Sequence, residues 1–176
     1  LGQPWICAMS KTPIITDPII LKADDWQDYQ LLDSGHGRKL ERFGSQITDR
    51  PDPQAFWMPA NPIETWKADA TFSASGDDER GNWQKSRPNL PDDWKMGWNG
   101  LSFEVRRSPF RHLGVFQEHS VHWRHAQEKI RAAGRPIKLL NLFGYTGMMS
   151  LAAADAGAQV THIDASPKSN GYGKAN

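Results

Sequence analysis

The sequence contains a single cysteine, Cys7, so no disulfide can form within the chain. This composition favours a reducing cytoplasm as the location of the protein. No apolar run is long enough to cross a bilayer and no signal-peptide pattern is recognisable, so we expect no membrane partner. Neither sign of charge prevails, because 21 Lys and Arg face 20 Asp and Glu. Bulk electrostatics therefore give no reason to expect a nucleic acid or an anionic membrane as partner.

Tryptophan is frequent, with 8 copies in 176 residues, and most of the Trp and Pro residues lie before residue 110. That part of the chain shows short strand patterns, whereas a long helical pattern and a strand–turn–helix–strand pattern follow it. We therefore predict that the chain divides near residue 110. Residues 1–23 are predicted to be a disordered or extended segment, and residues 24–110 a small β-rich (α+β) domain.

The clearest strand pattern surrounds Asn99-Gly100, the dipeptide that favours a type I′ hairpin turn. Residues 94–98 and 101–105 on its two sides alternate between apolar and polar side chains. A two-residue turn sets the register and places all the apolar side chains on one face. The predicted pairs on that face are Trp98 with Leu101, Met96 with Phe103, and Trp94 with Val105.

Alternation also predicts strands in residues 28–32, 38–43 and 67–72, the first two joined by a turn at residues 34–37. Residues 74–81 are polar and contain two glycines, so we predict a loop there. Together these strands form a small, mostly antiparallel sheet with one apolar face.

Residues 118–133 form the longest helical pattern, with a narrow stripe made by Trp123, Ala126, Ile130 and Ala133. Gly134 and Pro136 are typical of the end of a helix. His119, His122 and His125 recur on the same helix, but no carboxylate completes a zinc pattern. We therefore predict a solvated face for these histidines and no metal site.

Residues 137–143 are apolar, as expected for a buried parallel strand. A turn bounded by Gly144 and Gly147 follows, then a predicted helix over residues 147–156 with Thr146 as its N-cap. A second strand ends at Asp164. In such a unit the turn and the acid lie at the same sheet edge, where ligands bind. Their separation of about 20 residues suits an acid that accepts hydrogen bonds from ribose hydroxyls.

The glycine spacing of this turn distinguishes between two cofactors. A dinucleotide needs G-x-G-x-x-G, which lets the backbone approach a pyrophosphate, whereas this turn has only G-x-x-G with Tyr145 inside it. That pattern favours S-adenosylmethionine (SAM), which has no pyrophosphate. An ordinary turn with chance glycines and a surface acid stays open as the alternative.

The segment Asn141-Leu-Phe-Gly-Tyr-Thr-Gly147 resembles the first motif of class I SAM-dependent methyltransferases, in particular the branch of bacterial 23S ribosomal RNA cytosine-5 methyltransferases. Residues 162–166 resemble the second motif, and residues 114–118 the motif that leads into the preceding helix. The resemblance implies an α/β fold class. A β-rich (α+β) N-terminal domain would be followed, in residues 111–176, by the start of a Rossmann-like doubly wound methyltransferase domain.

The resemblance also implies a set of cofactor-binding residues. Asn141, Phe143, Gly144, Tyr145 and Thr146, with Gly147 completing the turn, would line the methionine side of SAM. Asp164 would bind the ribose, Ala165 and Ser166 would lie against the adenosine, and Phe116 and Gln117 would close one side of the pocket.

The catalytic residues of that methyltransferase branch have no counterpart in this sequence, which lacks its Asp/Asn-Pro-Pro loop and its later cysteine. Cys7 lies in the predicted disordered segment and is not expected to act as a nucleophile. We therefore predict no catalytic residue and expect the chain to be a truncated N-terminal portion of a methyltransferase. An RNA substrate, a base of ribosomal RNA, is expected.

Two other functions stay open. One is a non-catalytic β-rich RNA-binding module with a partial cofactor fold, and the other is an NAD-dependent oxidoreductase, which the glycine spacing disfavours. A basic cluster of Arg106, Arg107, Arg111 and His112 lies near the predicted division. It either contacts RNA phosphates or is ordinary surface charge.

Overall fold

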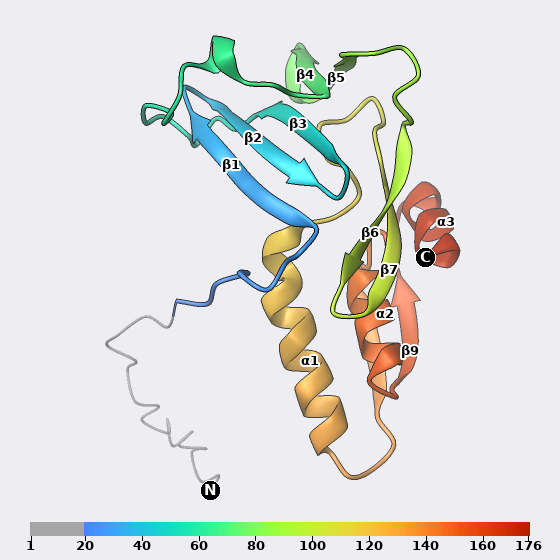
Figure 1. The fold of residues 1–176 in the computed structure, drawn as a ribbon. Helices are drawn as coiled ribbons and strands as arrows, with labels where there is room; N and C mark the ends of the chain where they lie inside the picture. The colour runs from blue at the N-terminus through green and yellow to red at the C-terminus, as the bar shows by residue number, and fades with distance from the viewer. Residues whose placement is uncertain (1–19) are drawn as a thin grey trace, which may run out of the picture.

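The computed structural model describes residues 20–176, without the side chains of residues 77–79 (Figure 1). Cys7 and most of the predicted segment 1–23 lie outside the described residues. The strands are β1 (Tyr29–Gly35), β2 (Arg38–Phe43), β3 (Gln46–Pro51), β4 (Ala70–Ser75), β5 (Asp77–Lys85), β6 (Asp93–Trp98), β7 (Leu101–Arg106), β8 (Lys138–Leu142) and β9 (Gln159–Ile163). The helices are η1 (Ile63–Thr65), η2 (Gln117–His119), α1 (Ser120–Ala132), α2 (Met148–Asp155) and α3 (Pro167–Ala175).

Strands β1 to β5 form one sheet in chain order, antiparallel except for a short parallel pairing of β3 with β4. β1, β2 and β4 confirm three predicted strands, although β4 begins three residues later than predicted, at Ala70. β3 is missed by the sequence pattern because its buried side chains are polar rather than apolar, and two of them, Asp49 and Arg50, are ion-paired. Arg50, for example, is 5% exposed and donates two hydrogen bonds to Glu41.

The loop predicted for residues 74–81 is wrong. Its backbone pairs as the ends of β4 and β5, with Ala74 opposite Gly81 and Ser75 opposite Asp77. Polar composition predicts a loop, but pairing with the neighbouring strand overrides that local preference.

The predicted hairpin is confirmed as β6 and β7. Trp98 lies opposite Leu101 and Met96 opposite Phe103, and Asn99 and Gly100 take positive φ values of 47° and 81°. Both central residues of a type I′ turn need positive φ, which explains the Asn-Gly dipeptide.

One hydrophobic cluster joins this hairpin to the elements that follow residue 110. It includes Trp98 and Phe103 of the hairpin, Leu113 of the connecting segment, Trp123 of α1 and Met148 of α2. The ring of Trp98 meets that of Trp123 edge-on, with centroids 5.2 Å apart. The predicted division near residue 110 stays a prediction, but the two parts share this core.

Helix α1 confirms the predicted helical pattern, and Gly134 follows its end with a φ of 62°. Besides Ser120 at the start of α1, the pattern missed a second buried polar residue, Gln127. Its side chain accepts a hydrogen bond from Asn99 at 2.9 Å and donates one to Asp155 at 2.9 Å. Gln127 therefore links the hairpin turn, α1 and the end of α2.

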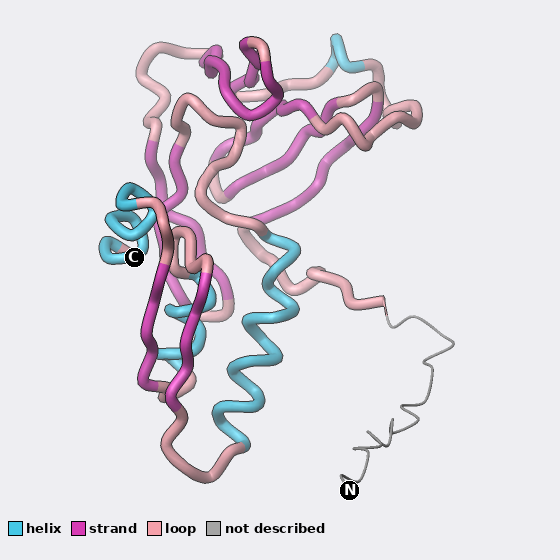
Figure 2. Tube along the Cα trace, turned by 180° about the vertical axis from the view of Figure 1, so that it is seen from behind, coloured by secondary structure: helices cyan, strands magenta, loops and turns pink. Residues whose placement is uncertain are grey.

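Strands β8 and β9 are parallel, with Leu139 opposite Val160, and α2 connects them as predicted. The prediction of a buried strand is wrong for β8, because every residue of it is exposed or only half-buried, and Leu140 and Leu142 are 58% and 54% exposed. Figure 2 shows the two strands with no helix of the described chain over the face turned away from α2. None of the helices in residues 20–176 has the length and apolarity that a bilayer crossing requires.

Candidate functional site

The turn between β8 and α2 is strained. Phe143 and Tyr145 both have left-handed φ values, 56° and 50°, which bulky residues rarely adopt. Gly144 lies between them, and a Cβ at that position would lie 2.3 Å from the His162 ring. Only glycine fits there without displacing the histidine. Backbone strain of this kind persists where the surrounding structure holds it, and it is concentrated at functional sites.

Asp164 holds this turn in place. One carboxylate oxygen accepts the Tyr145 N–H at 2.8 Å, and the other accepts the Ser166 N–H at 2.8 Å. These two backbone donors, that of Ser166 first, hold the pKa of the Asp164 carboxyl below its usual value. The predicted proximity of the glycine turn and the acid is confirmed. Each carboxylate oxygen also keeps a lone pair for another donor.

Thr146 does not cap α2, so that prediction is wrong. Its hydroxyl donates to the Gly114 carbonyl at 2.5 Å, and Gly147 precedes α2 without a side-chain cap. Thr146 instead ties the turn to the segment that leads into α1. Its own carbonyl accepts a hydrogen bond from the Asn176 side chain at 2.9 Å.

A cavity of about 400 Å³ opens between this turn and the start of α1, and we call it the glycine-turn cavity. Six predicted site residues line it: Phe116, Asn141, Phe143, Gly144, Tyr145 and Thr146. Leu142, Val115, Trp123, Met148, Met149, His119 and His122 complete the lining. The cavity is therefore bounded largely by apolar and aromatic side chains.

Asp164 lines a neighbouring cavity of about 450 Å³, together with His162, Asn170 and Lys174. Ser166 caps α3 by accepting the Ser169 N–H at 3.2 Å, and Ala165 is exposed between the two. The predicted residues 164–166 therefore lie together beyond Tyr145, outside the glycine-turn cavity.

Gln117 and Gly147 do not line either cavity. The Gln117 side chain donates to the Tyr29 hydroxyl at 3.2 Å, and its carbonyl accepts from the Trp26 indole at 3.0 Å. Gln117 thus anchors the start of α1 to the β-rich part of the chain. Gly147, with φ of 93°, packs against the Gly173 backbone of α3.

Two histidines of the cavity wall were missed. His119 and His122 lie one turn apart with ring centroids 6.0 Å apart, and the ring of His119 lies 5.6 Å from that of Phe116. The predicted solvated face is confirmed, since His119, His122 and His125 are all exposed, but His119 and His122 also line the glycine-turn cavity. Their spacing of three residues was the available signal. No group of three metal-binding side chains exists among the described residues.

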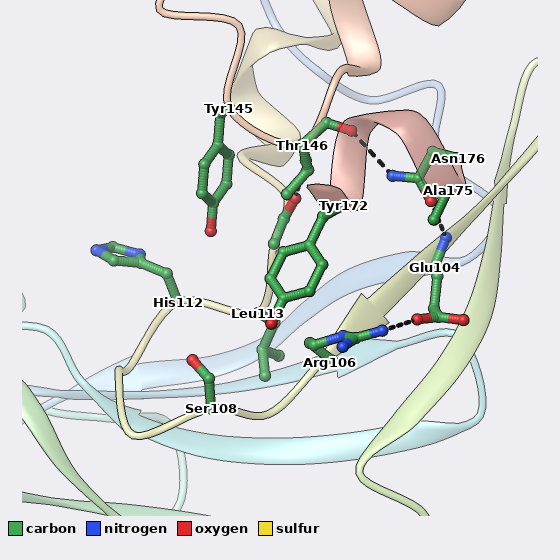
Figure 3. A pocket seen from close by; sticks show the side chains of 11 residues that line it. Glu104, Arg106, Ser108, His112, Leu113, Tyr145, Thr146, Tyr172, Ala175 and Asn176 are labelled. Atoms are coloured by element: carbon green, nitrogen blue, oxygen red, sulfur yellow. Dashed lines mark hydrogen bonds and ion pairs between the residues drawn. The ribbon is translucent and has the colours of Figure 1, made fainter. Parts of the chain in front are cut away.

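Tyr145 lines both the glycine-turn cavity and a small cavity of about 40 Å³, whose lining residues are drawn in Figure 3. Figure 3 shows the Tyr145 hydroxyl pointing toward the segment that carries Ser108 and His112. Across this cavity the Arg106 guanidinium lies over the Tyr172 ring, 4.2 Å from its centroid, and pairs with Glu104. Burial raises the pKa of the Tyr145 hydroxyl, so it stays protonated at neutral pH.

The fold places the members of the predicted basic cluster in different surroundings. Arg107 is 6% exposed and its guanidinium is bound by Gln46, the Pro91 carbonyl and Asp92, so it is a core residue. Arg106 is held by Glu104 and Tyr172. Arg111 and His112 line a fourth cavity, on the side of the β-rich sheet.

Comparison with solved structures places this arrangement in a known fold. The chain matches the SAM-dependent methyltransferase from Agrobacterium tumefaciens with a TM-score of 0.84 and 45% identity, over 89% of this chain and 50% of that one. A Streptococcus mutans protein described as a SAM-dependent methyltransferase matches with a TM-score of 0.60 and 17% identity, over 86% of this chain and 42% of that one. The chain therefore has the fold of SAM-dependent methyltransferases, and the predicted resemblance is confirmed.

Among curated proteins, the ribosomal RNA large subunit methyltransferase K/L of Alteromonas mediterranea is 38% identical over 69 residues. That match covers 39% of this chain and 9% of the Alteromonas protein. No protein-family model matches the chain. The chain spans about half the length of the Agrobacterium methyltransferase.

Proposed function

We propose that this chain carries the SAM-binding site of a methyltransferase that acts on RNA. The observation that carries the proposal is the hydrogen bond from the Tyr145 N–H to the Asp164 carboxylate. It joins the strained turn at the edge of the glycine-turn cavity to the acid at the tip of β9. This arrangement occurs in a chain that is 45% identical to a SAM-dependent methyltransferase.

The residues at the site fit SAM. The cavity of about 400 Å³ lies within the range of small-molecule sites, roughly 300 to 1,000 Å³. The rings of Phe116 and Tyr145, with centroids 5.4 Å apart, form an aromatic wall. Aromatic faces attract cations, so this wall suits the sulfonium of the methionine moiety. The turn lacks the G-x-G-x-x-G spacing that a pyrophosphate needs, which suits a ligand without one.

Asp164 is the proposed ribose ligand, because its lowered pKa keeps it ionised and its free lone pairs can accept hydroxyl hydrogens. Ala165 and Ser166, which follow it, are proposed to face the adenine. Asn141 and Phe143 are proposed to contact the methionine end. Gln117 supports the proposal indirectly, since it anchors the segment that carries Phe116.

Bound SAM supplies a methyl group on a sulfonium, and its transfer is an in-line displacement that depends chiefly on alignment of donor and acceptor. The proposed role of this chain is to hold the donor. We assign no catalytic residue. The proposal of RNA as acceptor rests on the likeness to the rRNA methyltransferase K/L, which is 38% identical in the matched segment.

The proposal includes the organisation of the chain. Residues 24–110 are proposed to be a small β-rich domain, and residues 111–176 to begin a Rossmann-like doubly wound domain that holds the cofactor. The cytoplasm is the proposed location, as the cysteine-poor composition and an RNA substrate both favour it.

Calorimetric titration of this chain with SAM, and separately with NAD, tests the proposal. We expect saturable binding of SAM and none of NAD. Asp164→Ala removes the proposed charged acceptor of the ribose hydroxyls, so SAM affinity should fall by roughly 10-fold or more. Asp164→Asn keeps an acceptor oxygen and should therefore lose less SAM affinity than Asp164→Ala.

Asp93→Ala is the matched control, since Asp93 is an exposed acid on β6. Thermal unfolding of each variant checks that the fold is kept. If SAM does not bind the folded chain, or if Asp164→Ala binds it as tightly as the parent chain, the proposal is wrong. Binding of NAD instead would favour the oxidoreductase.

A further inference from the structure

A row of three hydrogen-bonded side chains connects β8, α2 and β9. Asn141 of β8 and His162 of β9 lie opposite each other in the parallel strand pair. Between them, the Asn141 amide donates to the Ser150 hydroxyl at 2.9 Å, and Ser150 Oγ lies 2.9 Å from Nδ1 of His162. Since Asn141 also lines the glycine-turn cavity, the row reaches from that cavity to the strand that carries Asp164.

The His162 ring contacts both the glycine turn and α3. A Cβ at Gly144 would lie 2.3 Å from the ring, and a Cβ at Gly173 would lie 3.3 Å from its Nε2. Within the part of the chain that the structure describes, Nε2 has no hydrogen-bond partner and is shielded from solvent. An enclosed polar atom without a partner lowers stability, so an apolar side chain would suit this position better unless the other ring nitrogen has a task.

The order of donors in the row sets the orientation of the Asn141 amide. Ser150 Oγ accepts from Asn141, so the hydroxyl hydrogen remains for a second partner, and Nδ1 of His162 is within reach. A neutral imidazole with its proton on Nε2 accepts that hydrogen at Nδ1. Because the hydroxyl hydrogen is used in this way, Ser150 does not donate to Asn141, and the amide nitrogen of Asn141 stays turned toward α2.

This orientation decides what Asn141 offers to a ligand. Its amide nitrogen is bound to Ser150, so its carbonyl oxygen is the group that it presents to the glycine-turn cavity. The methionine end of SAM carries an ammonium group, which only donates hydrogen bonds. A carbonyl oxygen accepts from that ammonium, whereas an amide turned over would face it with N–H hydrogens and repel it.

We propose that His162 is a positioning residue for the amino-acid end of SAM. It acts through Ser150 to hold the Asn141 carbonyl oxygen toward the ammonium group, and it does not touch the ligand itself. The inference rests on the proposed function, in which Asn141 contacts the methionine end. Its consequence is selective: loss of the His162 acceptor weakens ligands that carry the amino-acid group and spares ligands that lack it.

Two neutral thioethers isolate this contact. S-adenosylhomocysteine keeps the amino-acid group of SAM, whereas 5′-methylthioadenosine lacks it. Calorimetric titration gives the affinity of the chain for each ligand. His162→Leu should lower the affinity for S-adenosylhomocysteine by roughly 10-fold, as expected for a lost hydrogen bond to a charged group, and should leave that for methylthioadenosine unchanged. A general distortion of the site would instead weaken both ligands.

His162→Asn is the rescue variant, because its amide oxygen supplies an acceptor in place of Nδ1. It should keep most of the preference for S-adenosylhomocysteine, whereas Ser150→Ala should lose it as His162→Leu does. Thr161→Ala is the control, since Thr161 is an exposed neighbour on β9, and it should change neither affinity. Thermal unfolding checks each variant, and Ser150→Ala carries the test if His162→Leu does not fold.

A double-mutant cycle tests whether His162 acts through Asn141. Asn141→Leu removes the proposed acceptor and should itself lower the affinity for S-adenosylhomocysteine. Adding His162→Leu to that variant should then lower the affinity no further, because the two substitutions break the same contact. A second loss of roughly 10-fold would mean that His162 acts independently of Asn141, and the proposal would be wrong.

Long-range ¹H–¹⁵N NMR spectra show which nitrogen of His162 carries the proton. We expect the proton on Nε2, and a proton on Nδ1 would reverse the row and overturn the proposal. If the parent chain binds SAM and both His162→Leu and Ser150→Ala keep the preference for S-adenosylhomocysteine, this inference is wrong and the proposed function stands. If the parent chain binds none of the three ligands, both are wrong.

Discussion

The hairpin β6–β7 buries its apolar side chains, whereas strand β8 of the β8–α2–β9 unit exposes apolar side chains of similar kind. In the hairpin, Met96 and Phe103 are 2% and 3% exposed, whereas in β8 Leu140 and Leu142 are 58% and 54% exposed. The hairpin is closed over by α1, α2 and the segment around Leu113. The strand pair β8–β9 has α2 on one face and an uncovered second face in the described chain.

The two regions differ in the interactions that stabilise them. The hairpin is held by burial, which removes apolar area from water at roughly 25 cal/mol per Å². The β8–α2–β9 unit is held at the edge that carries the glycine turn by hydrogen bonds to one carboxylate, that of Asp164, and it keeps strained backbone at Phe143 and Tyr145. We therefore expect substitutions in the first region to change stability and those in the second to change ligand binding.

The largest effect is expected from Glu41→Ala. Glu41 is fully buried and accepts two hydrogen bonds from Arg50, at 2.5 and 2.9 Å, and one from the Tyr29 hydroxyl. Its removal leaves a buried guanidinium uncompensated, which costs about 3–5 kcal/mol of the free energy of unfolding. Urea denaturation of the variant and the parent chain measures this loss of the free energy of unfolding. Arg131→Gln, which breaks the exposed pair with Asp155, should cost below about 1 kcal/mol, and equal costs would refute this contrast.

Met96→Ala against Leu140→Ala tests the comparison directly. Met96 is 2% exposed, so its truncation leaves a cavity and should lower the free energy of unfolding by about 2–5 kcal/mol. Leu140 is 58% exposed, and its truncation should stay within about 0.5 kcal/mol. The measurement is again urea denaturation. A cost for Leu140→Ala similar to that of Met96→Ala would mean that β8 is covered in solution.

Gly144→Ala should affect both stability and SAM binding. The added Cβ would lie 2.3 Å from the His162 ring, and overpacking of this kind costs about 1–3 kcal/mol. SAM affinity, measured by calorimetry, should fall as well because the turn must shift. Gly171→Ala in α3 meets nothing within 4 Å and should stabilise the helix by about 0.5–1 kcal/mol. Unchanged SAM affinity in Gly144→Ala would argue against the turn as a contact.

The smallest expected effect is a change in the free energy of unfolding that appears only below about pH 4. Burial raises the pKa of Asp33, but N–H donors from Ala60, Asn61 and Ser34 outweigh burial and hold that pKa below its usual value. A lowered pKa in the folded state means that the stabilisation is complete above about pH 4 and is lost as the pH falls further. Asp33→Asn should therefore flatten the dependence of stability on pH below about pH 4. Chemical denaturation at several pH values measures this, and an unchanged slope would contradict it.

Several parts of the fold could be predicted because their signals are local. Asn99-Gly100 sets the hairpin register, and Gly144 and Asp164 mark the turn and the acid that meet at one sheet edge. β3 could not be predicted, since its buried residues are polar and their partners come from other strands. His119 and His122 are exposed as predicted, but the sequence does not show that the glycine turn lies opposite them and that they line its cavity.

The sequence by itself determined the hairpin, the order of the β8–α2–β9 unit and the pairing of its glycine turn with Asp164, since each depends on residues within about 20 positions of one another. Only the tertiary structure decided which members of the basic cluster face solvent and what Thr146 binds. Arg107 is enclosed by Gln46, 61 positions away, and Thr146 reaches Gly114, 32 positions away. Neighbours brought together over such separations depend on packing of the whole chain, which no local pattern encodes.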